Sequence, residues 1–327
     1  MGGGALPPLT WATGLGTWRF ALVADVLVVL AAFGYLHRAY RVLPRQGLRW
    51  PAGRAVAFFG ALAALAVTLN SGIDVYADEL FWMHMIEHLA LIVLVPVLLI
   101  LGRPVGLLAR STEEHTDRTA MLTKQVLDSR VVSWLTFPPA GLAAYAVVLV
   151  GTHLTGFMQL MLTHMWLHQV EIVLYLGSGY LFFLPVLDDE PLRRTLSYPL
   201  RVFLLFLGMV VDTVVGVVLM MSATEPFPAY AAVGRTWGPS LLGDIHTGGG
   251  IMWVIGDGLM FLVVVLVVKR WMADTERQND TGRWLESARR SAMAGYGLDA
   301  GDEAKDLDAD DAALDAYNRM LRKLSER

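Results

Sequence analysis

Uninterrupted apolar runs constrain this chain more than any other feature. Several reach about 20 residues, the length of helix that crosses a hydrocarbon core about 30 Å thick. Only 17% of the 327 residues are charged, fewer than in a typical soluble domain. We therefore expect an all-α, polytopic membrane protein. The runs predict seven transmembrane helices, at residues 18–38, 53–71, 79–101, 131–152, 159–186, 200–222 and 247–269.

Charges in the connecting segments predict how these spans are oriented. Short loops rich in Lys and Arg mark the cytoplasmic side of a membrane. Residues 38–54 contain five arginines and no acidic residue, whereas residues 72–79 contain three acidic residues and no basic one. The N-terminus is therefore expected outside and the C-terminus inside.

The apolar runs and the charge pattern divide the chain into three parts. Residues 1–17 form a short outer segment, residues 18–270 the seven-span domain, and residues 271–327 a polar cytoplasmic tail. The tail contains 13 acidic and 9 basic residues, so the net charge of −4 comes from the tail. Apolar residues at helical spacing predict a short cytoplasmic amphipathic helix near residues 308–326. That helix could pack on the protein or pair with another copy, which leaves a homo-oligomer open.

Two short motifs of the form HMxxH place histidines where the apolar runs begin. They contain His84 with His88, and His164 with His168, while His153 and His246 fall at the same outer ends of other spans. An i, i+4 spacing puts both rings of a pair on one helix face, about 6 Å apart along the axis. Two such helices facing each other would supply four nitrogens to one metal ion.

The other residue types narrow the choice of metal. Cysteine is absent, which excludes thiolate ligands, iron–sulfur clusters and disulfides. Eight of the 15 methionines, Met161 among them, fall in the same outer halves of the spans. Thioether sulfur suits Cu(I), and imidazole suits copper or zinc. Copper is therefore the expected metal, with Cu(I) favoured, and zinc or haem is the alternative.

Acidic residues inside the predicted spans are a further anomaly. Glu87, Glu171, Asp212 and Asp257 have no Lys or Arg at matching depth in the sequence pattern. Such residues usually face the protein interior or a hydrated cavity. We expect Glu87, Glu171 and Asp212 to support the histidines or to line an ion path. Asp74, in the loop before the third span, is a possible oxygen ligand.

At this level the chain resembles a known family, the CtaG-type cytochrome c oxidase assembly factors of bacterial plasma membranes. The matching stretches are FWMHMIEHLALIVLVPVLLILGRP (81–104), HMWLHQVEIVLYLGSGYLFFLPVL (164–187), DTVVGVVLMMSATEPFPAY (212–230) and DIHTGGGIMWVIGDG (244–258). The resemblance implies a seven-span protein needed to make active haem–copper oxidase, acting in metallation of its copper centres. It places candidate ligands at His84, His88, His164 and His168, with His246 and Asp74 as further candidates.

The expected function is therefore a non-enzymatic assembly factor in the bacterial plasma (inner) membrane. It would bind copper at the outward-facing histidine cluster, with cytochrome c oxidase subunits and other copper-handling proteins as partners in the lipid bilayer. Three alternatives stay open: a b-type haem protein, an intramembrane zinc-dependent hydrolase, and an ion carrier using Glu171, Asp212 and Asp257. Nothing in the charge pattern indicates nucleic-acid binding.

Overall fold

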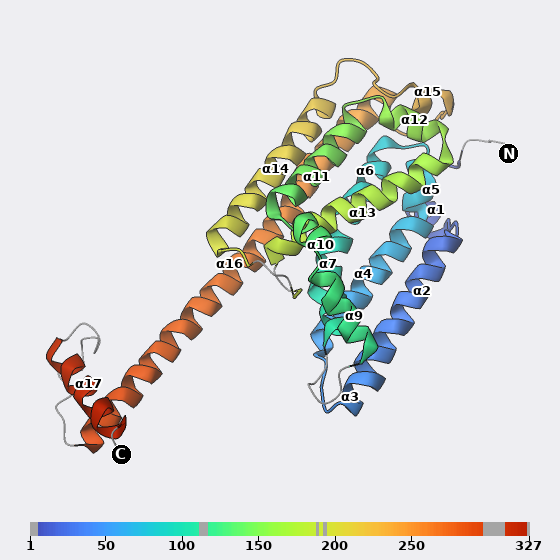
Figure 1. Ribbon diagram of the computed structural model, residues 1–327. Coiled ribbons are helices and arrows are strands. Elements are labelled where there is room, and N and C mark those ends of the chain that lie inside the picture. The colour runs from blue at the N-terminus through green and yellow to red at the C-terminus, as the bar shows by residue number, and fades with distance from the viewer. Residues whose placement is uncertain (1–5, 111–116, 188–189, 192–194, 297–310, 326–327) are drawn as a thin grey trace. The chain divides into compact units, whose positions relative to one another are not determined.

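The computed structural model describes residues 6–110, 117–187, 190–191, 195–296 and 311–325 (Figure 1). Every regular element in these ranges is a helix. Six helices are long and apolar enough to cross a membrane, and a seventh span is counted if the bent pair α11 and α12 is one broken span. The expected all-helical, multi-pass architecture is therefore confirmed at this level.

The elements up to residue 110 carry the first three spans and the turns between them. They are α1 (Trp11–Gly16), α2 (Leu22–His37), η1 (Arg38–Val42), α3 (Leu43–Arg45), α4 (Ala52–Asn70), α5 (Gly72–Ala77), α6 (Phe81–Leu89), η2 (Ala90–Leu94), α7 (Val95–Gly102) and α8 (Pro104–Ala109). Both η elements are π-helical turns within longer helices.

The remaining elements begin at residue 118. They are α9 (Arg118–Leu127), α10 (Arg130–Leu135), α11 (Pro138–His153), α12 (Phe157–Thr163), α13 (Met165–Leu187), α14 (Tyr198–Met220), α15 (Pro228–Ala232), α16 (Leu241–Gly295) and α17 (Asp311–Ser325).

The predicted fourth span, 131–152, is wrong at its start. Residues 130–135 form the separate helix α10. Pro138 is the first residue of α11 and does not lie inside a longer helix. Proline is favoured in the first turn of a helix because its missing N–H has no intrahelical partner there. Helix α11 is therefore shorter than the apolar run.

The predicted fifth span, 159–186, is not continuous. Helix α12 ends at Thr163, α13 begins at Met165, and α12 makes an angle of 67° with α11. His164 adopts an extended backbone between them. Its ring Nδ1 lies 3.0 Å from the Leu160 carbonyl oxygen, the acceptor that a continuing helix would offer to the His164 N–H, which instead donates to Met161. The side chain thus takes the place of the next helical hydrogen bond.

Close contact between α13 and η2 aligns the two helices that carry most of the site. Pro96 has no N–H to donate to the Ile92 carbonyl, four residues earlier. Gly179 of α13 lies directly against that carbonyl, in contact so close that a Cβ atom would overlap the Ile92 oxygen. The absence of a side chain at Gly179 lets the two backbones touch.

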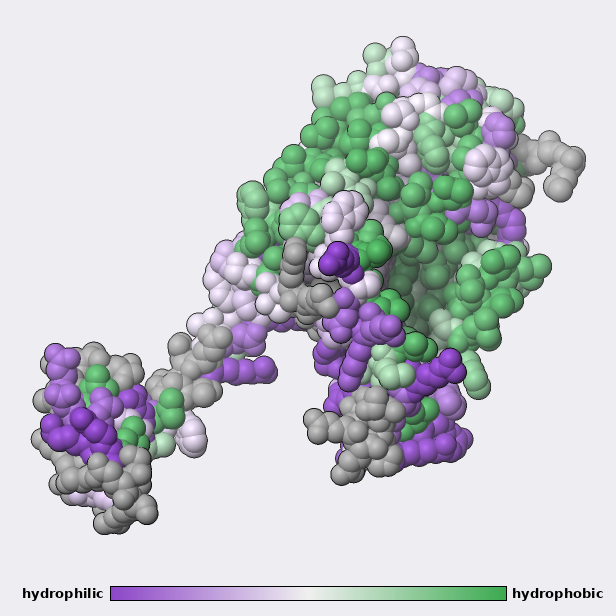
Figure 2. All heavy atoms as spheres, viewed as in Figure 1, coloured by the Kyte–Doolittle hydropathy of each residue, from purple (hydrophilic) through white to green (hydrophobic). Residues whose placement is uncertain are grey.

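The helices of the first unit, residues 1–267, carry much hydrophobic surface (Figure 2). On α2, large apolar side chains such as Val23, Leu27 and Phe33 are exposed. Contiguous exposed apolar surface of this kind suits contact with lipid, where a helix satisfies its own backbone hydrogen bonds.

Residues 268–327 form a second compact unit. Within it, Met320 and Ala316 of α17 are buried against Met293. The helix predicted near 308–326 therefore exists as α17, Asp311–Ser325, while residues 308–310 and 326 lie outside the described residues.

Candidate metal centre

Helix α6 carries three of the site residues, and its first turn is fixed by a carboxylate from another helix. Asp244 of α16 accepts hydrogen bonds from the backbone N–H groups of Phe81 and Trp82, at 3.1 and 3.0 Å. Arg235 pairs with the same carboxylate at 3.1 Å. Free N–H groups at a helix start favour a negative charge. Asp244 therefore holds α6 in place one turn before His84.

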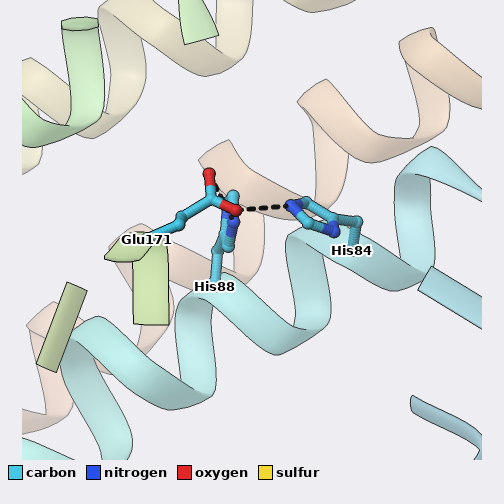
Figure 3. A group of neighbouring side chains, drawn as sticks. All are labelled: His84, His88 and Glu171. Atoms are coloured by element: carbon cyan, nitrogen blue, oxygen red, sulfur yellow. Dashed lines mark ion pairs between the residues drawn. The ribbon is translucent and has the colours of Figure 1, made fainter. Parts of the chain in front are cut away.

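Three buried side chains from α6 and α13 converge in an inner group, His84, His88 and Glu171 (Figure 3). His84 Nε2 lies 3.5 Å from Glu171 Oε2, and His88 Nε2 lies 3.4 Å from Glu171 Oε1. The donor atoms of the three residues all lie within 4.8 Å of one another. Figure 3 shows the carboxylate directed at both rings.

These separations are long for hydrogen bonds and suitable for ligands that share one ion. Two donor atoms, each about 2.0–2.1 Å from a tetrahedral metal, lie about 3.3–3.4 Å apart. Both Glu171 oxygens and the Nε2 atoms of His84 and His88 are buried without a hydrogen-bond partner. A buried polar atom left unpaired costs about 1–3 kcal/mol, and a proton or a metal ion shared by these atoms would remove that cost.

A second group, called here the outer group, consists of His84, Glu87 and His168. His168 Nε2 lies 3.4 Å from Glu87 Oε1, and His84 Nδ1 lies 3.9 Å from Glu87 Oε2. Both Glu87 oxygens are buried without a hydrogen-bond partner. The two groups share His84 and together use side chains from only α6 and α13.

Neighbouring side chains orient His88. Its Nδ1 lies 3.2 Å from His153 Nε2, and the Tyr175 ring stacks on it with centroids 4.0 Å apart. The Tyr175 hydroxyl lies 2.7 Å from the Thr152 hydroxyl. A partner on one ring nitrogen fixes the tautomer and leaves the other nitrogen for a metal. Sequence reasoning included His153 but missed Thr152 and Tyr175, although Tyr175 follows Glu171 by one helical turn.

The structure does not bring the remaining predicted ligands into either group. The side chain of His164 is exposed, because the helix breaks at that residue. His246 is half-buried, and its Nε2 lies 2.8 Å from the Ser222 carbonyl oxygen. Asp212 accepts a hydrogen bond from the Tyr145 hydroxyl at 2.9 Å. His164, His246 and Asp212 therefore belong to neither the inner nor the outer group.

A cavity of about 530 Å³ adjoins the outer group. Its lining includes His168, the buried Met161, Asp74 and Arg19. Arg19 pairs with Asp74 at 2.8 Å and with Asp78 at 3.0 Å. Asp74, predicted as a possible oxygen ligand, and Met161, one of the outer methionines, thus line the cavity beside His168.

Asp74 lies outside the spans, and burial raises its pKa to about 6, with the Glu87 carboxylate adding to the rise. A carboxyl whose pKa is raised in the folded state stabilises the fold fully below its ordinary pKa of 3.8, and this contribution is lost as the pH rises through about 6. We expect Asp74→Asn to remove that pH dependence. Thermal unfolding in detergent between pH 4 and 7 measures it, and parallel curves for the two proteins would contradict it.

The comparisons with known proteins show which family the chain belongs to. The sequence profile described as cytochrome c oxidase caa3 assembly factor (Caa3_CtaG) matches residues 33–274. The chain belongs to this family. The Caa3_CtaG match includes α6, α13 and every residue of the inner and outer groups.

Mycobacterial relatives extend the similarity over nearly the whole chain. The chain is 32% identical over 323 residues to an uncharacterized protein of Mycobacterium bovis, covering 97% of this chain and 46% of that protein. An uncharacterized protein of Mycobacterium leprae is 30% identical over 313 residues, or 94% of this chain and 44% of that protein. The chain thus spans about half the length of the curated relatives it matches. No solved structure matches it.

Proposed function

We propose that this Caa3_CtaG protein binds copper at the inner group, His84, His88 and Glu171, and supplies it during assembly of cytochrome c oxidase. The family supports the assembly role. The metal role is carried by one observation: two buried histidine nitrogens lie 3.4 and 3.5 Å from the two oxygens of one carboxylate. Copper is the cargo in this proposal, and the role is non-enzymatic.

The charge of the site supports a small cation. Among the described residues, neither Glu87 nor Glu171 forms an ion pair with a Lys or Arg, and both are buried. Their ion-pair partners are the histidines His84, His88 and His168, so burial of both carboxylates is unfavourable unless a ring is protonated or a cation is bound. A copper ion would neutralise charge and supply the missing contacts, and imidazole nitrogen is a good copper ligand.

The same spacing argues against haem as the occupant. A porphyrin with two axial histidines needs a flat slot several ångströms wide between the rings. The Glu171 carboxylate lies within 3.5 Å of both His84 and His88, and Tyr175 stacks on the His88 ring. These contacts favour an ion shared by the donor atoms over a macrocycle between the rings.

The protein is also expected to have a defined orientation in the membrane. The metal centre lies where α4 leads through α5 into α6, and the arginine-rich residues 38–54 connect the opposite ends of α2 and α4. The bias of Lys and Arg toward the cytoplasm therefore supports a metal centre at the outer face of the bacterial plasma membrane, with α17 in the cytoplasm. The recipient would be a copper-binding subunit of the oxidase.

Metal analysis of the protein tests the proposal directly. We expect the purified protein to bind one copper ion per chain when it is titrated with Cu(I) or Cu(II) and then separated from free metal. Two histidines and a glutamate also form the ligand set of some catalytic zinc sites, which makes a zinc-dependent hydrolase the second candidate. Tightly bound zinc that copper does not displace would favour the hydrolase, and no bound metal would reject both.

Copper content of the oxidase tests the cellular role. We expect oxidase isolated from cells lacking this protein to be deficient in copper while haem is retained. Complementation with the wild-type gene should restore the copper content. Fully copper-loaded oxidase in the deletion strain would contradict the metallation role, even if the isolated protein binds copper.

A further inference from the structure

We propose that the metal centre has two positions for one copper ion, and that His84 hands the ion from an outer position to an inner one. The outer position uses His84, Glu87 and His168, and the inner position uses His84, His88 and Glu171. This inference rests on the proposed copper function and specifies the path of the ion within it.

The geometry of the His84 ring separates the two positions. Its Nε2 lies 3.5 Å from Glu171, and its Nδ1 lies 3.9 Å from Glu87. The lone pairs of the two nitrogens lie in the ring plane and point in diverging directions, so one ion cannot bind both. Each nitrogen therefore serves a different ion position, and each position has its own carboxylate and second histidine.

The protonation of His84 limits the two positions to one ion at a time. A neutral imidazole has one lone pair for a metal and one N–H. With copper on Nδ1, the proton is on Nε2, facing Glu171. With copper on Nε2, the proton is on Nδ1, facing Glu87. Transfer releases one proton from Nε2 and adds one at Nδ1, so the copper oxidation state and the number of protons are unchanged.

Exposure gives the order of the two positions. The His168 side chain is 13% exposed, and it lines the same cavity as Asp74 and Met161. The side chains of His88 and Glu171 are 4% and 1% exposed. A cation entering from the cavity passes the ion pair of Arg19 with Asp74 and the Met161 thioether. It then meets His168 and Glu87, and it reaches Glu171 last. The outer position is thus the loading position and the inner one the holding position.

Two variants separate loading from holding. In stopped-flow measurements with Cu(II), we expect His168→Gln to slow copper uptake by about 10-fold or more and to leave the equilibrium affinity within a few-fold. We expect His88→Gln to keep rapid uptake and to lower the affinity by about 10-fold or more, with rapid release to a chelator. Electron paramagnetic resonance of bound Cu(II) should show different ligand sets in the two variants.

Control proteins distinguish the possible outcomes. His164→Gln, at the exposed histidine, should match the wild type, and Glu87→Gln provides a second test of the outer position if His168→Gln fails to fold. Equal loss of affinity in His168→Gln and His88→Gln, without a difference in uptake, would show one composite site and overturn the inference alone. Binding of two copper ions per chain would overturn it as well, because His84 would then not serve the two positions one at a time. Absence of copper binding in the wild type would overturn the proposed function itself.

Discussion

Replacing His84 by Gln is expected to lower the affinity for copper by at least about 100-fold, because loss of a direct ligand should exceed the 10–100-fold effect typical of residues that only support ligands. His84 is the residue that the inner and outer groups share. Gln keeps a side chain of similar size but provides no imidazole nitrogen. Competition titration of the purified variant with a copper chelator measures the loss.

The matched control is His164→Gln. His84 and His164 each begin an HMxxH motif, so the motif alone gives them equal weight. The structure buries His84 between two carboxylates and leaves His164 exposed at a helix break. Copper affinity should therefore stay within about twofold of wild type in His164→Gln. Equal losses in the two variants would reject the assignment of the site to α6 and α13.

Gly179→Ala is expected to destabilise the protein and weaken the site without altering any ligand. The added methyl group would overlap the Ile92 carbonyl, so α13 must move away from η2. Overpacking of this kind costs about 1–3 kcal/mol. Glu171 and Tyr175 lie on the same helix and contact His88, so the displacement should also change the metal geometry. Thermal unfolding and copper titration in detergent measure both effects.

Gly177→Ala separates this packing effect from the general consequence of replacing glycine in a helix. Gly177 lies two residues away on α13, is exposed, and has nothing within 4 Å of the position a Cβ would take. Alanine favours a helix over glycine by about 1 kcal/mol, so Gly177→Ala should be neutral or stabilising. Similar destabilisation by both substitutions would contradict the proposed contact at Gly179.

The spans were predictable because apolar length is a local property of sequence. The breaks within the spans were less predictable. Pro138 and His164 each lie inside an apolar run, yet Pro138 begins a helix and His164 separates two. These outcomes depend on which hydrogen bond each backbone group finds, such as the contact between the His164 ring and the Leu160 carbonyl. Hydropathy does not contain that information.

The site was predictable in composition and less so in geometry. The sequence predicted His84, His88 and His168 as ligands together with His164 and His246, and it indicated Glu87 and Glu171 as supporting residues among several others. It favoured four histidine nitrogens around one ion, whereas the structure groups histidines with a carboxylate in each of two triads. Glu171 could not be ranked above Asp212 from sequence, because which neighbouring helix each faces is set by packing. The Tyr145 hydroxyl donates a hydrogen bond to the Asp212 carboxylate, while Glu171 forms its ion pairs, among the described residues, with His84 and His88.

The π-helical turn η2 accommodates one extra residue between the two halves of the third span. An α-helix advances by about 100° per residue, and a π-helical turn contains one residue more than an α-helical one. His84 and His88 lie before this turn, and Ile92, whose carbonyl oxygen meets Gly179, lies within it. Deleting one residue from Ala90–Leu94 would give a regular α-helix in which both halves keep nearly the same faces, because the π-helical turn absorbs the extra residue. Relatives that retain the ligands but lack a residue here should therefore keep α13 packed on the same face.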